Sequence, residues 1–215
     1  MNLETLFQKW EKAYKKNGIN EPFVKDGIVD KDKYKGIVWL LRETNDYDGN
    51  LANLIKDCIN HKENHKKYWK TPQTHYKESI AVYSLLNHSS PNNEIKKYKI
   101  DGLKYAAVVN IKKISGDNKS DYEEIVEHLK TYKSFLQKEI ELLNPKVVIV
   151  GGMRGKKRIK NILTELFELK EKEKFIYKSN SHDILFLETY HPSYSAIKWD
   201  DWINFFKKVG KNYLK

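Results

Sequence analysis

The chain has 215 residues, enough for one substantial core, and we expect a single domain and a monomer. Its 40 Lys and Arg against 29 Asp and Glu give a formal charge of +11, which favours a polyanionic partner because neutralised phosphates release counterions. The single Cys58 excludes an intrachain disulfide, and no apolar run approaches the roughly 20 residues that span a bilayer. The polar N-terminus is unlike a signal peptide, so we expect a cytoplasmic protein without a membrane partner.

Apolar side chains at helical spacing predict the first helix. Leu3, Phe7, Trp10 and Tyr14 recur every three or four residues over 2–17, and Gly18 ends the pattern. Further helices are expected over 51–59, over 75–86, over 121–143 with Ser120 as N-cap, from about 156, and over 196–214. Loops are expected over 89–93 and 115–120.

Four short apolar runs predict buried strands, over 36–41, 105–109, 146–150 and 184–189. Strands that alternate with helices indicate a parallel sheet covered on both faces. We therefore predict an α/β protein: a three-layer α/β/α fold with a central, mostly parallel four-stranded sheet over 1–215. Within this single domain, residues 1–30 are expected to form an N-terminal helical extension.

Each predicted strand ends in residues that can do chemistry. Glu43 and Asn45 follow the first strand, Asn110 ends the second, Gly151-Gly152 ends the third and His191 follows the fourth. The carboxyl ends of parallel strands meet at one edge, where open α/β sheets bind their ligands. The sequence therefore predicts a site at this edge.

Three segments carry a family resemblance: His191-Pro192-Ser193-Tyr194-Ser195-Ala196, Val109-Asn110-Ile111-Lys112, and Asn144 to Gly152. Together, from about Gly36 onward, they resemble the uracil-DNA glycosylase superfamily. The resemblance implies that His191 hydrogen-bonds O2 of a pyrimidine and that Asn110 reads the edge of the base. It also implies that Ser193, Tyr194 and Ser195 contact DNA.

The first motif of that family departs from its usual pattern here. Leu41 to Asp46 contains neither the glycine nor the proline that family members usually carry. The resemblance implies that Glu43, Asn45 or Asp46 positions the attacking water, and the choice among them stays open. One branch of the family binds an iron–sulfur cluster through four cysteines, which Cys58 alone cannot do, so we expect no cofactor.

Other candidate residues are aromatic or basic. An extruded base needs an aromatic or apolar face to rest on, and Tyr47, Tyr68 and Trp69 follow the first motif, with Trp69 preferred. A glycine turn before a helix can hold phosphate, and the residues there predicted to contact DNA are Gly152, Arg154, Lys156 and Lys157. Cys58, His61 and His65 have the spacing of helical metal ligands but lack a fourth partner, so no metal is expected.

The resulting hypothesis is a monofunctional DNA glycosylase. It would flip a uracil or a modified pyrimidine out of double- or single-stranded DNA and hydrolyse its N-glycosidic bond, in repair or in defence against phage with modified DNA. A catalytically inactive DNA-binding protein of the same fold is the alternative. A nucleotide-processing hydrolase that uses His191 on a phosphate is a third reading.

Overall fold

The computed structural model describes residues 1–45, 47–61, 72–116, 121–152 and 154–214, and it has an α/β architecture. The four apolar runs predicted as strands are confirmed as β2 (Ile37–Leu41), β4 (Ala106–Asn110), β6 (Val147–Val150) and β9 (Leu185–Glu188). They lie side by side in the order β4-β2-β6-β9, and each neighbouring pair is parallel. Their carboxyl ends therefore share one edge, as predicted.

The prediction of a four-stranded, mostly parallel sheet is wrong, because the sheet is mixed and has seven strands. β1 (Gly27–Ile28) pairs antiparallel with β4, and β8 (Ile176–Ser179) and β7 (Leu169–Glu173) continue antiparallel beyond β9. These edge strands lack an apolar run: β1 has two residues, and β7 reads Leu-Lys-Glu-Lys-Glu, a charged composition typical of protected sheet edges. A separate ladder joins β3 (Thr44–Asn45) to β5 (Ser115–Gly116), where we had expected a loop.

The predicted helices are confirmed with small shifts at their ends. They are α1 (Leu3–Lys16), α2 (Leu51–Asn60), α4 (Pro72–Leu86), α6 (Tyr122–Leu143), α7 (Lys157–Phe167) and α8 (Trp199–Tyr213). Two short elements, α5 (Asn92–Ile95) and the 3-10 helix η2 (Asp101–Tyr105), precede β4, and α5 begins inside a predicted loop. The N-cap of α6 is Asp121 rather than Ser120, because the Asp121 carboxylate accepts the N–H groups of Glu123 and Glu124.

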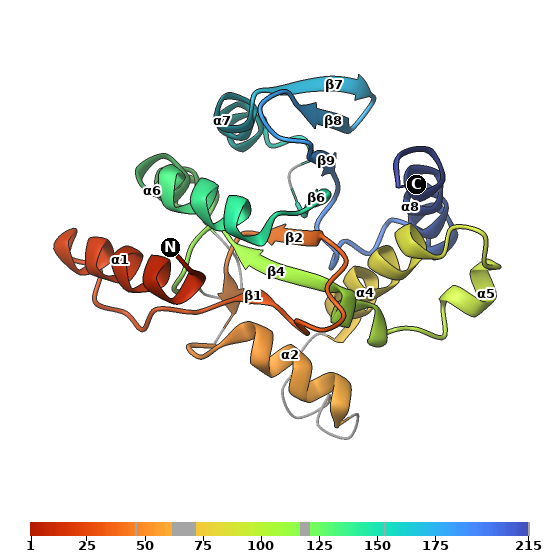
Figure 1. The fold of residues 1–215 in the computed structure, drawn as a ribbon, viewed down its shortest axis with the longest axis horizontal. Helices are drawn as coiled ribbons and strands as arrows, with labels where there is room; N and C mark the ends of the chain where they lie inside the picture. Colours follow the sequence, from red (N-terminus) through yellow and green to blue (C-terminus); the bar gives the residue numbers. More distant parts are fainter. Residues whose placement is uncertain (46, 62–71, 117–120, 153, 215) are drawn as a thin grey trace.

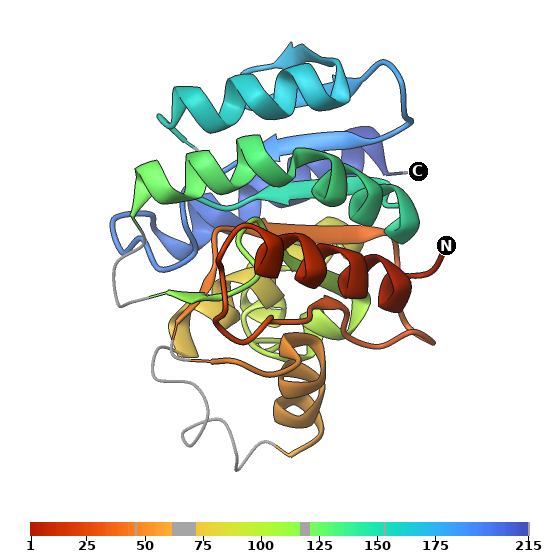
Figure 2. The same ribbon diagram turned by 90° about the vertical axis from the view of Figure 1, so that its left-hand side faces the viewer.

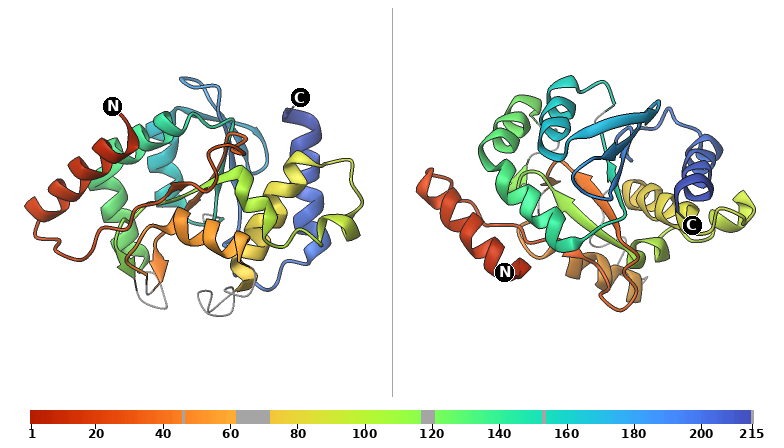
Figure 3. Two further views of the ribbon diagram at one scale, coloured as in Figure 1. Left: turned by 60° about the horizontal axis from the view of Figure 1, so that its bottom comes forward. Right: turned by 45° about the horizontal axis from the view of Figure 1, so that its top comes forward.

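Helices cover both faces of the sheet (Figure 1). On one face α1, α6 and α7 pack on Val38, Leu40 and Val148, and on the other α2, α4 and α8 pack on Trp39 and Ile149. Figure 2 looks onto the first face, with α1 and α6 in front of the sheet. Figure 3 shows α6 beside α7 on one side and α4 beside α8 on the other. Burial on both faces explains why the central strands are apolar throughout.

The N-terminal helix packs tightly on α6. The Trp10 ring stacks on Phe135 at a centroid distance of 5.5 Å, and the Tyr14 ring meets Tyr132 edge-on at 4.5 Å. Trp10 and Tyr14 are both fully buried. Burial of aromatic rings of this size contributes substantially to a core. Residues of the predicted extension therefore form part of the hydrophobic core.

Candidate active site

The candidate site lies where the strand order reverses. The chain places β4 on one side of β2 and later places β6 on the other side, which is the arrangement that opens a crevice at the carboxyl edge. Arg42 and Glu43 leave β2 at this point, Asn110 ends β4, Gly151-Gly152 follow β6, and His191 follows β9. With strands about 4.8 Å apart, the backbones of β4 and β9 are about 14 Å from each other, a span that a planar base and two side chains can fill.

The His191 side chain has a defined tautomer. Its Nδ1 accepts the backbone N–H of Ser193 at 3.2 Å and lies 2.7 Å from the Ser193 hydroxyl. Because an N–H can only donate, Nδ1 carries no proton in the neutral ring, and the proton resides on Nε2. His191 therefore presents an Nε2–H donor, and the Ser193 that follows Pro192 orients the ring.

Charged groups surround the His191 ring. Burial is the largest effect on the pKa of His191 and lowers it. The Glu78 carboxylate raises this pKa, whereas Arg42 and His75 lower it further. A lowered pKa keeps the imidazole neutral at pH 7. The Arg42 guanidinium donates to Gly152 O at 2.9 Å, which anchors this cation beside the histidine.

Gly152 permits this close approach. It has φ +78°, and a Cβ added there would lie 3.0 Å from Arg42 Nη2 and 3.2 Å from His191 Cβ. Any larger residue would need both a left-handed backbone and displacement of two site residues. The glycine turn after β6 thus serves to bring Arg42 and His191 together.

The charge environment of His191 makes a testable prediction about its titration. We expect an NMR midpoint below 6.5 in the native protein, a higher midpoint in Arg42→Ala and a lower one in Glu78→Gln. Since the folded pKa lies below the unfolded one, protonation favours unfolding, and this group lowers stability as the pH falls below about 6.5. A midpoint that stays fixed in both variants would refute this placement of the charges.

Asn110 is buried with its side chain unsatisfied. It is 1% exposed, and neither Oδ1 nor Nδ2 has a hydrogen-bond partner among the described residues. Strand alternation places this side chain on the same face as Ala106 and Val108, which is also the face covered by α4. An unpaired buried polar group costs about 1–3 kcal/mol, so a buried amide facing this way is suited to a ligand.

A fully buried charge network holds the Asn110 backbone. Asn110 N–H donates to Asp26 Oδ2 at 2.7 Å, and Lys113 Nζ lies 2.6 and 2.7 Å from the two Asp26 oxygens. The same ammonium lies 2.7 Å from Glu139 Oε2 on α6. Burial and the Asp26 charge raise the pKa of Glu139 well above its usual range, which favours its protonated form. This network fixes the end of β4 against α6 and the segment before β1.

Of the predicted water-positioning residues, the described Glu43 and Asn45 are not gathered around His191. Glu43 is buried and paired with Lys112 at 2.7 Å, and Lys112 in turn pairs with Glu124 of α6, the helix on the opposite face. Its carboxylate also packs so closely on Gly116 that a Cβ there would clash. Asn45 is exposed in β3, and Asp46 lies outside the described residues. The structure therefore separates Glu43 from the α4 side of the edge.

Two residues of α4 that we did not predict lie on the His191 side. His75 Nδ1 is 2.9 Å from Glu78 Oε2, and the Glu78 side chain is 0% exposed with Oε1 lacking a partner among the described residues. Lys77 Nζ donates to Tyr194 O at 2.5 Å and so ties α4 to the histidine loop. The only signal in the sequence is the i,i+3 spacing of His75 and Glu78, which puts both on one helix face.

Of the predicted base-stacking residues, the structure describes Tyr47, which lies close to the start of α2. Tyr47 OH donates to Asn50 O at 3.1 Å and its N–H donates to Ser115 Oγ at 3.1 Å, which holds the ring at the start of α2. Tyr68 and Trp69 lie outside the described residues. Within the part of the chain that the structure describes, Tyr47 makes no hydrogen bond or ring contact with His191 or Asn110.

The predicted DNA-contacting residues lie on the rim of the site. Ser193, Tyr194 and Ser195 are exposed in the loop after His191, and Lys157 is exposed at the start of α7. Lys156 Nζ lies 4.5 Å above the Tyr122 ring, and Arg154 stacks on Tyr190. Further along α7, Arg158 pairs with Glu123 and Lys160 with Glu188, so these two cations are neutralised.

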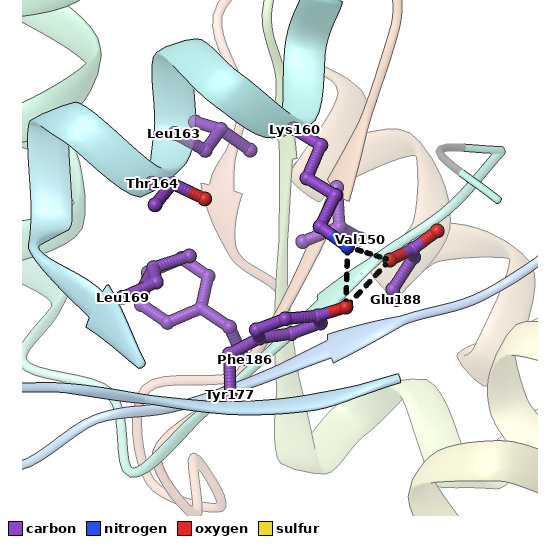
Figure 4. A pocket seen from close by; sticks show the side chains of 8 residues that line it. All are labelled: Val150, Lys160, Leu163, Thr164, Leu169, Tyr177, Phe186 and Glu188. Carbon is purple, nitrogen blue, oxygen red and sulfur yellow. Dashed lines mark hydrogen bonds and ion pairs between the residues drawn. The ribbon is translucent and has the colours of Figure 1, made fainter. Parts of the chain in front are cut away.

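A small pocket between α7 and the sheet is a separate feature (Figure 4). Lys160 Nζ donates to Tyr177 OH at 2.6 Å, and Tyr177 OH donates to Glu188 Oε2 at 3.1 Å. The rest of its lining is mainly apolar, including Leu163 and Phe186. The side chains of Lys160, Tyr177 and Glu188 bond to one another, so this network acts as an internal tie between α7 and β8-β9.

The sequence matches no protein-family model and no curated protein, so the functional argument rests on the site itself. Among the described helices, none combines the length and the apolar character that a membrane span requires. The described residues contain no group of three or more His, Cys, Asp and Glu side chains that could hold a metal ion. His65, one of the three residues with metal-like spacing, lies outside them.

Proposed function

We propose that this chain is a monofunctional DNA glycosylase with a fold like that of the uracil-DNA glycosylases. It flips a uracil or a modified pyrimidine out of DNA and hydrolyses the N-glycosidic bond, leaving an abasic site. The observation that carries this proposal is the neutral His191, whose Nδ1 is occupied by Ser193, together with the buried unsatisfied amide of Asn110 at the same edge of the sheet. The charge of +11 supports a DNA substrate.

The chemistry follows from where charge develops. As the bond between the sugar C1′ and the base nitrogen breaks, electrons move to the base and positive charge grows on the sugar. His191 Nε2–H donates to the base oxygen that gains the negative charge, and the Arg42 guanidinium beside it stabilises the same charge electrostatically. Asn110 offers one donor and one acceptor to the edge of the base. The water oxygen then bonds to C1′, and one proton of that water is transferred to the departed base, so the products are a neutral free base and an abasic sugar.

An assay on oligonucleotides tests this proposal. Duplex and single-stranded oligonucleotides that carry uracil or modified cytosines are incubated with the protein and then treated with hot alkali, which breaks the strand at abasic sites. We expect breaks at the target base. Absence of breaks with every base, despite salt-sensitive binding, would overturn the enzymatic proposal.

One observation favours the alternative of an inactive DNA-binding protein. Glu43, which the resemblance aligns with a water-positioning glutamate, is held by Lys112 away from the α4 side of the edge. If the protein is an enzyme, Glu78 is a second carboxylate near His191 that can position the attacking water in place of Glu43. If Glu78→Gln leaves the excision rate unchanged, this role for Glu78 is excluded.

The unsatisfied Asn110 side chain predicts opposite effects on stability and activity. Asn110→Ala removes two unpaired buried groups but keeps the backbone bond to Asp26, so the melting temperature should stay the same or rise. Excision should fall by about 5- to 150-fold, because a base-reading hydrogen bond of about 1–3 kcal/mol is lost. Asn212→Ala, at an exposed position near the end of α8, is the matched control. A clear loss of stability without loss of excision would show that Asn110 is structural.

A further inference from the structure

A stack of planar groups lies next to the candidate site. The Arg154 guanidinium is sandwiched between two rings, 3.6 Å from the Phe175 centroid and 4.4 Å from the Tyr190 centroid. Tyr190 in turn stacks on Tyr194 with a centroid distance of 5.0 Å and an interplanar angle of 18°. The order is therefore Phe175, Arg154, Tyr190, Tyr194, which places Tyr194 at the end nearest the loop of His191.

The backbone around each member holds this stack in place. Arg154 N–H donates to Thr189 O at 3.2 Å, and Tyr194 N–H donates to His191 O at 2.9 Å. Phe175 has φ +71°, a left-handed conformation that bulky residues rarely adopt, and its carbonyl accepts Glu188 N–H at 2.9 Å. Backbone strain of this kind concentrates at functional sites. The rigid stack costs little further ordering when a ligand binds.

The outer end of the stack is open and positively charged. Tyr194 is 48% exposed although Tyr190 stacks on one face of its ring, so about half of this residue is accessible to a ligand. No ion pair joins Arg154, Lys156 or Lys157 to a carboxylate in the described parts of the chain. An aromatic face beside unneutralised cations is the combination that binds the bases and backbone of a single strand.

We propose that Tyr194, backed by Tyr190 and Arg154, is a stacking platform for an unpaired base of single-stranded DNA next to the nucleotide held at His191. A base inside a duplex has both faces covered by its neighbours, so only an unstacked base can use the platform. The position of the platform beside a target nucleotide rests on the proposed function, whereas its binding of single strands does not require excision. The inference extends the proposed function by predicting a preference for single strands.

The test compares two ligands and four proteins by fluorescence anisotropy. The ligands are a short labelled oligothymidylate and an abasic strand of the same length and charge. We expect Tyr194→Ala to weaken oligothymidylate binding by about 5- to 150-fold, the loss typical of one base–aromatic stack, and to leave binding of the abasic strand within about twofold. Tyr98→Ala is the control, because Tyr98 is also exposed and stacked on a tyrosine, Tyr83, but lies before η2.

Phe175→Gly tests the stack without risk of misfolding. Glycine suits the positive φ at this position, so the variant should fold while losing the ring beneath Arg154. We expect weaker oligothymidylate binding together with an unchanged or higher melting temperature. Equal affinity of native protein and Tyr194→Ala for oligothymidylate would overturn the platform, even if excision occurs. A loss confined to base-carrying strands would support it, even if no base is ever excised.

Discussion

His191→Ala should lower the single-turnover rate of base excision by about 10²- to 10³-fold, the usual cost of removing one donor to a developing anion. The neutral ring donates from Nε2, because Ser193 occupies Nδ1. DNA binding should change only a few-fold, since the ring interacts most strongly with the departing base rather than with the backbone. The rate is measured with excess protein over a labelled oligonucleotide.

Two variants make this result specific. His182→Ala removes a histidine that bonds to Ser181 in the turn between β8 and β9, at the opposite end of β9 from the His191 loop, and should leave the rate unchanged. His191→Gln keeps an N–H donor and should recover part of the lost rate. If His191→Ala retains a rate within a few-fold of the native protein, His191 is not the donor to the leaving group.

Lys113→Met should destabilise the protein by about 3–5 kcal/mol, because it leaves the buried Asp26 carboxylate without its counter-charge. Asp26, Lys113 and Glu139 all have side chains that are 0% exposed, and the ammonium contacts both carboxyl groups. The expected result is a large decrease in the urea concentration at the midpoint of unfolding, followed by circular dichroism.

The control is an exposed ion pair of similar composition. Lys130 pairs with Glu127 at 2.7 Å, but its side chain is 49% exposed, and Lys130→Met should change stability by less than about 1 kcal/mol. Adding Asp26→Asn to Lys113→Met removes the stranded carboxylate and should restore part of the stability. An effect of Lys113→Met no larger than that of Lys130→Met would contradict a structural role for the network.

Local sequence patterns predicted the centre of the fold and missed its edges. Val147–Val150 is apolar throughout because both faces of β6 are covered, and that run is visible in the sequence. β7 is charged and β1 has two residues, so their pairing depends on neighbours that are distant in sequence rather than on their own composition. The mixed sheet was therefore outside the reach of hydrophobic patterning.

The candidate site was likewise predicted only in part from the sequence. His191 and Asn110 could be proposed because strand ends are recognisable and parallel strands bring them to one edge. The approach of His75 and Glu78 to His191 could not be predicted, because it depends on which face of the sheet α4 covers. The pairing of Glu43 with Lys112 likewise depends on β2 and β4 lying side by side. Residue types thus indicated the chemistry, and tertiary packing determined which side chains share a face.

The most direct test of the central proposal identifies the released product. A uracil-containing or modified-cytosine oligonucleotide is incubated with the protein, and the small molecules are analysed by mass spectrometry. Excision predicts release of the intact free base, with the strand still continuous before alkali treatment and with release greatly reduced in His191→Ala. Release of a nucleoside or nucleotide, or of nothing from any of these substrates, would contradict a DNA glycosylase.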